Sequence, residues 1–367
     1  MKILHFIYDD MKNPWYGGGA SLRTHEIYKR MTKKHDITVI TGNYPGATKK
    51  ESLDGIQYIR MGLGRSPYLS VLTYSSTALL TKGMDKYGIV VKDIIPFAPT
   101  FTLGGNKTPK IFILQALGYQ FFKNLGPLGL LPWGIEKVSL YRSKHFIATS
   151  PSMAQQLRQR VSPEANICII PYGVDEELFK ISGSEERYIL FLGRLDIYQK
   201  GLDVLLKAFQ QVSRRFPNLR LIIAGGGRQE KHFKSMVAKS PARDKIELVG
   251  RVIGERKRGL LGNCLLVCMP SRFESWGIVA IEGGAAGKPV IGTKIRGLCD
   301  SIKDGETGIL VAPERPNLLA EKMIYLIENE NERKRLGCNG RLWAKNFNWD
   351  DLAREQERFY VEVANAY

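Results

Sequence analysis

The chain has 367 residues, of which 44% are hydrophobic, enough for two buried cores at the usual size of roughly 150 residues per domain. Its 54 Lys and Arg residues outnumber 36 Asp and Glu residues, and the net charge of +18 favours acidic partners: nucleotides, nucleic acid or an anionic membrane surface. This composition excludes a disordered chain, and no uninterrupted apolar run reaches the ~20 residues of a membrane-spanning helix.

The first apolar run, residues 3–8, predicts a buried strand. It is too short for the hydrophobic region of a signal peptide, because Asp9 and Asp10 follow it at once. The five cysteines are scattered and form no Cys-x2-Cys pair, which predicts reduced thiols and a cytoplasmic protein. Cys264 and Cys268 have no nearby His or Cys to complete a metal site, so we expect them in the core.

Short β-branched runs alternate with helical patterns in two successive series, which predicts two parallel sheets built from βαβ units. The expected strands of the first series are 3–8, 37–41, 89–95, 111–114, 145–149 and 167–171. Those of the second series are 188–193, 219–224, 246–249, 265–269, 289–291 and 309–311. The polar stretch between the series predicts a first domain over 1–171, a linker over 172–187 and a second domain over 188–346.

A glycine run, Gly17 to Gly19, precedes the predicted helix 20–32. Glycines let backbone amides approach an anion at a helix N-terminus. The spacing is not G-x-G-x-x-G, so it does not support a nicotinamide site, and a plain turn explains it as well as a binding loop does.

Two cations flank the first loop of the second series. Arg194 follows the strand that ends at Gly193, and Lys200 precedes the amphipathic helix 202–216. Ligands of open α/β sheets bind at the carboxyl ends of parallel strands, so these cations could neutralise a diphosphate, although a solvated basic loop is the alternative. The glycine run 225–227 follows the next strand at the same expected edge.

The segment 270–282 is the most informative. Glu274 lies in the loop after a predicted strand, Gly277 begins a helix with free amides, and Glu282 follows within two turns. At about 100° per residue, the eight-residue spacing brings the two glutamates within roughly 80°, so both can border one cleft. Their neighbours are apolar. Because burying a charged side chain among apolar residues is unfavourable without a polar partner, we expect these glutamates to bind polar groups.

These motifs resemble the retaining glycosyltransferases of family 4, and the resemblance covers nearly the whole chain. The matching positions are 17–19, 150, 170–175, 193–195, 200–201, 224–227, 274–282, 287–290 and 304–308. The resemblance implies an α/β protein of GT-B fold, with two facing Rossmann-like domains and a deep cleft between them. It also implies that the second domain binds most of a nucleotide sugar and that a last helix, 347–367, packs back on the first.

The resemblance also implies roles for individual residues. Arg194 and Lys200 would hold the donor diphosphate and stabilise the leaving group, and Glu274 would face the donor sugar. Glu282 would accept hydrogen bonds from the ribose hydroxyls. The other donor-binding positions are Gly18 and Gly19 of the first domain and Gly193, Gly225, Gly277, Ile278 and Val279 of the second.

The acceptor side departs from the family pattern. Members often carry a histidine after the strand corresponding to 111–114, where this chain has Gln115 and, farther along, Tyr119 as candidate acceptor-side residues. A glutamine can hydrogen-bond a sugar hydroxyl but cannot act as a general base. The segment 117–144 mixes aromatic, apolar and basic residues, which suits attachment to an anionic membrane surface or, equally, a core-facing loop and helix.

The sequence therefore predicts a retaining hexosyltransferase that uses a UDP- or GDP-sugar and a glycan or lipid-linked acceptor. No Asp-x-Asp occurs, which fits an enzyme without metal or other cofactor. A GT-B-fold epimerase would need acid and base residues facing C2 of the sugar, and the missing histidine leaves a non-catalytic subunit open. A nucleic-acid-binding protein is a remote alternative, because no RNA-binding, zinc or helix-turn-helix pattern stands out, and we expect no nucleic-acid partner.

Overall fold

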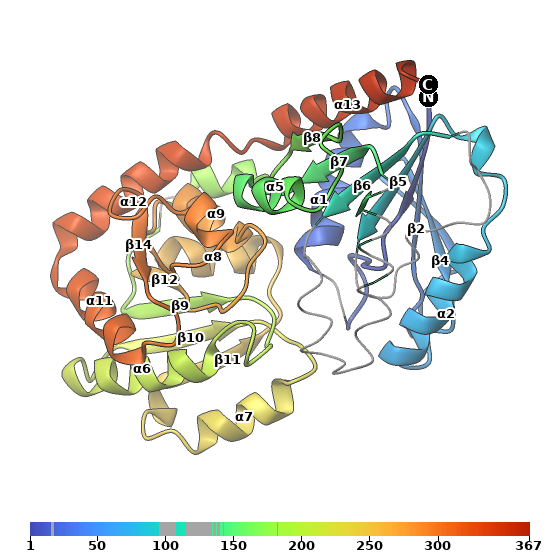
Figure 1. The fold of residues 1–367 in the computed structure, drawn as a ribbon. Helices are drawn as coiled ribbons and strands as arrows, with labels where there is room; N and C mark the ends of the chain where they lie inside the picture. Colours follow the sequence, from blue (N-terminus) through green and yellow to red (C-terminus); the bar gives the residue numbers. More distant parts are fainter. Residues whose placement is uncertain are drawn as a thin grey trace. The chain divides into compact units, whose positions relative to one another are not determined.

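The computed structural model describes residues 1–15, 18–94, 108–114, 134, 137, 140–141, 143–181 and 183–367. The chain divides into two compact units (Figure 1). Unit 1 comprises Met1–Tyr172 with Trp349–Tyr367, and unit 2 comprises Gly173–Asn348. Residues 173–187, which the sequence predicts as a linker, belong to unit 2.

Unit 1 contains an eight-stranded sheet in the order β3-β4-β2-β1-β5-β6-β7-β8. Its strands are β1 (Lys2–Phe6), β2 (Asp36–Gly42), β3 (Lys50–Leu53), β4 (Ile56–Met61), β5 (Ile89–Ile94), β6 (Lys110–Leu114), β7 (His145–Ala148) and β8 (Asn166–Ile169). All neighbours pair in parallel except β3 and β4, a hairpin that the sequence analysis missed. Its turn is Asp54-Gly55, and both residues have positive φ.

Among the described residues, unit 1 has the helices α1 (Gly19–Met31), α2 (Pro67–Leu79) and α5 (Pro151–Arg158) and the last helix, α13 (Trp349–Asn365). A buried polar chain joins α1 to α13. The Arg23 guanidinium donates to Gln356 Oε1 at 2.8 Å, Gln356 Nε2 donates to the Tyr360 hydroxyl at 2.7 Å, and this hydroxyl lies 3.1 Å from that of Tyr28. Arg23 Nε is buried without a hydrogen-bond partner among the described residues, but the other polar groups named here are paired, which limits the free-energy cost of burying them.

Unit 2 contains a six-stranded parallel sheet in the order β11-β10-β9-β12-β13-β14. Its strands are β9 (Tyr188–Leu192), β10 (Arg220–Ala224), β11 (Ile246–Gly250), β12 (Leu266–Met269), β13 (Val290–Thr293) and β14 (Gly308–Val311). Its helices are α6 (Leu202–Arg215), α7 (Glu230–Ala238), α8 (Gly254–Asn263), α9 (Ile278–Ala285), α10 (Leu298–Ser301), α11 (Pro316–Glu328) and α12 (Glu330–Ala344). The strand order reverses between β9 and β12, and the carboxyl ends of strands at such a switch point are where α/β sheets bind ligands.

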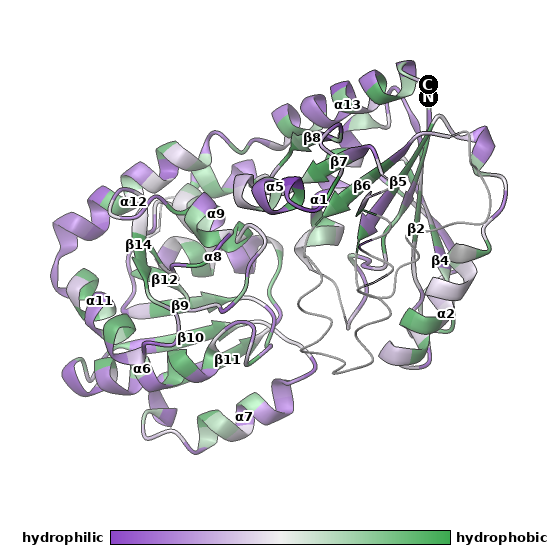
Figure 2. Ribbon diagram, viewed as in Figure 1, coloured by the Kyte–Doolittle hydropathy of each residue, from purple (hydrophilic) through white to green (hydrophobic). Residues whose placement is uncertain are grey.

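Both sheets match the prediction of a Rossmann-like α/β fold. Hydrophobic residues gather in the strands, and the outer turns of α11, α12 and α13 are hydrophilic (Figure 2). Cys264 and Cys268 are buried in unit 2 as expected, and burial raises the pKa of the Cys264 thiol to about 12. Within the residues that the structure describes, no helix is long and apolar enough to cross a membrane.

Glycines let α9 and α12 pack closely. A Cβ on Gly284 would lie 2.8 Å from the carbonyl oxygen of Gly340, and one on Gly337 would lie 2.1 Å from that of Gly287. Two glycines inside a helix, Gly283 and Gly284, each cost about 1 kcal/mol relative to Ala. A Cβ on Gly284 would meet the backbone of Gly340 and one on Gly283 would lie 3.0 Å from the Val290 side chain, so close packing explains both glycines. The contact fixes α9, which carries Glu282, against the body of unit 2.

We predict that Gly337→Ala destabilises the protein by about 1–3 kcal/mol, because the new methyl group must displace backbone. Gly259→Ala is the matched control. It is also helical, a Cβ there meets nothing within 4 Å, and it should stabilise by about 0.5–1 kcal/mol. Urea unfolding followed by circular dichroism measures both changes. Equal stabilisation by the two substitutions would contradict the packing argument.

Candidate functional site

Three loops of unit 2 meet at the carboxyl edge of its sheet, and glycines permit their approach. A Cβ on Gly225, after β10, would lie 1.8 Å from the carbonyl oxygen of Gly193, after β9. Gly201, which has φ +64, lies so close to the loop after β12 that a Cβ would be 2.0 Å from the carbonyl oxygen of Pro270. The loops after β9, β10 and β12 are therefore packed backbone against backbone.

Lys200 and Glu274 form an ion pair within this edge. Lys200 Nζ lies 2.5 Å from Glu274 Oε1, and the Ser271 hydroxyl donates to the same oxygen at 2.9 Å. The side chains are only 15% and 10% exposed. The structure thus brings two of the predicted catalytic residues into contact.

Arg194, the third predicted catalytic residue, follows Gly193 in the loop after β9. Its side chain is exposed, and no ion pair to its guanidinium is found with any residue described here. A cation left in this state at a strand end can meet an anionic ligand without first breaking a salt bridge.

Arg272 joins the two loops that carry Lys200 and Glu274. Its guanidinium binds both carboxylate oxygens of Asp203 at 2.8 Å and also donates to the Tyr198 carbonyl at 2.9 Å. Burial raises the pKa of Asp203, but the hydrogen bonds from Arg272 outweigh it, so the pKa is lowered overall. Arg272 was not predicted from the sequence; the one available signal was a lone arginine two positions before Glu274.

Glu282 lies in α9 and is 3% exposed. Its Oε1 accepts a hydrogen bond from Lys257 Nζ at 2.5 Å, while its Oε2 is buried and has no hydrogen-bond partner among the described residues. Burying a carboxylate oxygen without a hydrogen-bond donor is energetically unfavourable. This oxygen is therefore a candidate acceptor for a hydrogen bond from a ligand. Lys257, on α8, was not predicted.

The N-terminus of α9 supplies backbone donors at the same edge. Gly277 caps the helix with φ +82, and no side chain caps it, so the first amides of Ile278 and Val279 can meet an anion. One part of the sequence argument was wrong. Glu274 precedes the helix by four residues, so the rotation per helical residue does not relate its direction to that of Glu282.

The glycine loop of unit 1 leads into α1. Gly18 is its N-cap, without a side-chain cap, and Gly19 approaches Tyr172 so closely that a Cβ would lie 3.2 Å from the ring. Gly17 and both acceptor-side candidates, Gln115 and Tyr119, lie outside the described residues, as does most of the segment 117–144.

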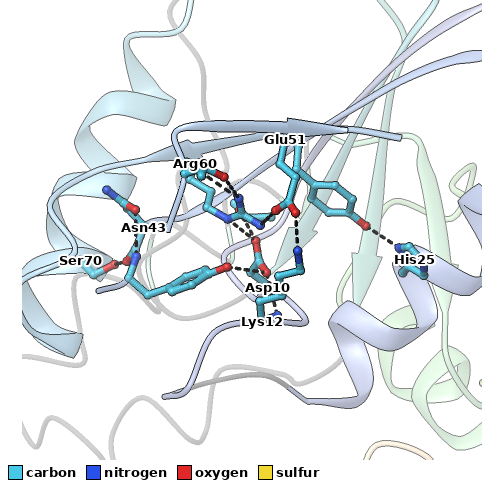
Figure 3. A network of polar contacts seen from close by, with 11 residues as sticks. Asp10, Lys12, His25, Asn43, Glu51, Arg60 and Ser70 are labelled. Atoms are coloured by element: carbon cyan, nitrogen blue, oxygen red, sulfur yellow. Dashed lines mark hydrogen bonds and ion pairs between the residues drawn. The ribbon is translucent and has the colours of Figure 1, made fainter. Parts of the chain in front are cut away.

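A buried ion-pair network holds the chain between β1 and this glycine loop (Figure 3). Arg60 Nε donates to Asp10 Oδ2 at 2.8 Å, with each side chain 2% exposed, and its Nη2 donates to Glu51 at 2.8 Å. Lys12 pairs with Glu51, and its backbone N–H donates to Asp10 Oδ1 at 2.8 Å. Burial, together with the Asp10 charge, raises the pKa of Tyr44 to about 12, which keeps that phenol protonated.

Comparisons with known proteins identify the family and the fold. The family model described as glycosyl transferases group 1 matches residues 174–343, and that of glycosyltransferase family 4 matches residues 17–178. A glycosyltransferase of Methanocaldococcus jannaschii is 32% identical over 95% of this chain and 96% of its own. Two solved structures cover 100% of both chains: sucrose-phosphate synthase of Thermosynechococcus elongatus, 21% identical with TM-score 0.81, and Anabaena HepE in complex with UDP-glucose, 18% identical with TM-score 0.77.

We predict that Asp10→Ala destabilises the protein by about 3–5 kcal/mol, because it leaves the Arg60 guanidinium buried without its main partner. The control is Glu321→Ala, which removes a 62% exposed carboxylate and should change stability by less than about 0.5 kcal/mol. Chemical denaturation compares the two variants. A similar small loss in both would show that the network does not hold the loop.

Proposed function

Because the chain belongs to the group 1 glycosyltransferases of family 4, we propose that it transfers a hexose from a UDP- or GDP-sugar to a hydroxyl group of a glycan or lipid-linked acceptor, with retention of anomeric configuration. The observation that carries the proposal is the Oε2 of Glu282, which is buried in the helix after β12 and has no partner among the described residues, together with the Lys200–Glu274 pair between the loops after β9 and β12. A ligand with hydroxyl groups and a diphosphate would donate hydrogen bonds to Glu282 Oε2 and bring negative charge to Lys200.

Arg194 and Lys200 would bind the donor diphosphate. The amides of Gly277, Ile278 and Val279 would add donors to phosphate or sugar oxygens, and Gly193 and Gly225 would allow the close approach of the backbone. Gly18 and Gly19 would contribute amides from unit 1. The solved complex of HepE with UDP-glucose supports a nucleotide sugar as the donor.

The transfer breaks the bond between the anomeric carbon and the phosphate oxygen and forms one to the acceptor oxygen on the same face. Negative charge builds up on the departing diphosphate, where Lys200 and Arg194 stabilise it. The acceptor proton passes to a phosphate oxygen of the leaving group, so no protein nucleophile is needed. Glu274, oriented by Lys200 and Ser271, would hold the donor sugar.

The proposed enzyme uses no metal, because Arg and Lys supply the positive charge that a divalent cation supplies elsewhere. On the acceptor side, Gln115 and Tyr119 stay candidates for binding the sugar hydroxyl. A sugar-nucleotide epimerase or a non-catalytic subunit would bind the donor equally well, and product analysis separates the three.

We predict that one labelled sugar from a panel of UDP- and GDP-sugars is transferred to a glycan or membrane-lipid extract, and that EDTA does not reduce the rate. Arg194→Ala and Glu274→Ala should each lower the rate by at least about 100-fold. Arg214→Ala, which removes an exposed cation on α6, is the control. If no donor is consumed and none raises the melting temperature, the proposal fails; conversion of a donor to its epimer would favour the epimerase.

Helix α2 supports a membrane location for the acceptor. Its buried positions include the small or polar residues Ser70 and Ala78, while Leu69 and Leu72 on its outer side are 36% and 59% exposed. Further large exposed side chains adjoin them: Leu63, Tyr68 and Leu80. The exposed cations Arg65, Lys82 and Lys86 flank the helix, so its outer side suits the cytoplasmic face of an anionic membrane.

We predict that the protein sediments with vesicles containing phosphatidylglycerol, and that Leu69→Ser with Leu72→Ser weakens this binding at least about tenfold. Leu342→Ser on α12 removes an equally exposed leucine, 59%, from unit 2 and should leave binding unchanged. Equal binding by all three proteins would show that α2 is not the attachment surface.

A further inference from the structure

Lys257 and Glu282 meet across two helices that begin at the same edge of the unit 2 sheet. Lys257 is the fourth residue of α8, which follows β11, and Glu282 is the fifth residue of α9, which follows β12. Helices that follow parallel strands begin at the carboxyl edge, so both residues lie within about one turn of the candidate site.

The pair is incomplete as a structural salt bridge. Lys257 Nζ lies 2.5 Å from Glu282 Oε1, yet Oε2 is buried and has no partner among the described residues. Lys257 is 24% exposed, whereas Glu282 is 3% exposed and follows the buried apolar residues Ala280 and Ile281. A purely structural pair is stable when all its polar atoms are satisfied, and this one leaves an acceptor unoccupied.

We propose that Lys257 is a positioning residue for nucleotide recognition: it holds the Glu282 carboxylate through Oε1 and so presents Oε2 to the hydroxyl groups of the nucleotide ribose. This inference rests on the proposed function, and it assigns a role to a residue outside the motifs that carry the family resemblance. A carboxylate only accepts hydrogen bonds, and a ribose diol has two O–H donors. The charge-assisted hydrogen bond from the ammonium therefore fixes the orientation of the carboxylate on which the contact depends.

Two other roles for Lys257 predict different behaviour. If the ammonium bound the nucleotide phosphates, its loss would weaken binding whether or not the ribose hydroxyls were present. If it only stabilised the fold, its loss would lower the melting temperature without changing the preference for ribose. The preference for ribose over dideoxyribose therefore isolates the positioning role.

The test is calorimetric titration of the full chain with UDP and GDP and with their 2′,3′-dideoxy forms. For the nucleotide that binds, the wild-type chain should prefer the ribose form by at least about tenfold, because hydrogen bonds to a buried charged group are strong. Lys257→Met should reduce this preference to less than about threefold, mainly through weaker binding of the ribose form. Lys257→Arg should retain it, and Arg256→Met, which removes the exposed cation next along α8, should leave it unchanged.

Glu282→Gln and the double variant test the coupling. Glu282→Gln should also lose the preference, and the double variant Lys257→Met with Glu282→Gln should lose no more than the single ones, since both act on one contact. If Lys257→Met does not fold, Lys257→Gln keeps a hydrogen-bond donor to Oε1 and should lower the preference at least about threefold.

An unchanged preference in Lys257→Met and Lys257→Gln, or equal weakening of the ribose and dideoxy forms in them, would overturn the positioning role while leaving the proposed function standing. Failure of the wild-type chain to bind either nucleotide would overturn the proposed function and this inference with it.

Discussion

The candidate site depends on the close approach of backbone at the carboxyl edge of the unit 2 sheet. Gly225 contacts the carbonyl of Gly193, Gly201 contacts that of Pro270, and a Cβ on Gly297 would lie 2.4 Å from the carbonyl oxygen of Glu274. A side chain at any of these positions would separate loops that carry the polar groups of the site. The glycines thus allow loops from different strand ends to pack closely, which brings their side chains together. The two hydrogen bonds from Arg272 to Asp203 then hold these loops in place.

Two glutamates at this edge of the sheet, Glu274 and Glu282, are each held by a lysine. Glu274 and Glu282 are each largely buried, and each has one carboxylate oxygen held by a lysine, Lys200 and Lys257 respectively. A single lysine offsets the charge of each carboxylate without occupying all of its acceptor capacity. At Glu282 this leaves Oε2 as an oriented acceptor without a partner among the described residues, and Arg194 is an exposed cation in the loop after β9.

Much of the fold could be predicted, because parallel strands buried on both faces are continuous apolar runs. Helix α2 was not predicted because apolar residues lie on both of its sides: Tyr74 is buried with Ser70, while Leu72 is exposed, so no single apolar stripe marks the helix. Glu282 could be predicted because a glutamate among apolar neighbours is unfavourable unless it has a polar partner. Lys257 and Arg60 could not, since their partners lie 25 and 50 residues away and only the folded chain brings them together.

The most direct measurement is a crystal structure of the chain with UDP or GDP bound. We expect the ribose hydroxyls to lie within hydrogen-bond distance of Glu282 Oε2, with Lys257 still on Oε1. We also expect the diphosphate to contact Arg194, Lys200 and the first amides of α9. A nucleotide bound away from the carboxyl ends of β9, β10 and β12, or a ribose that does not touch Glu282, would contradict these expectations.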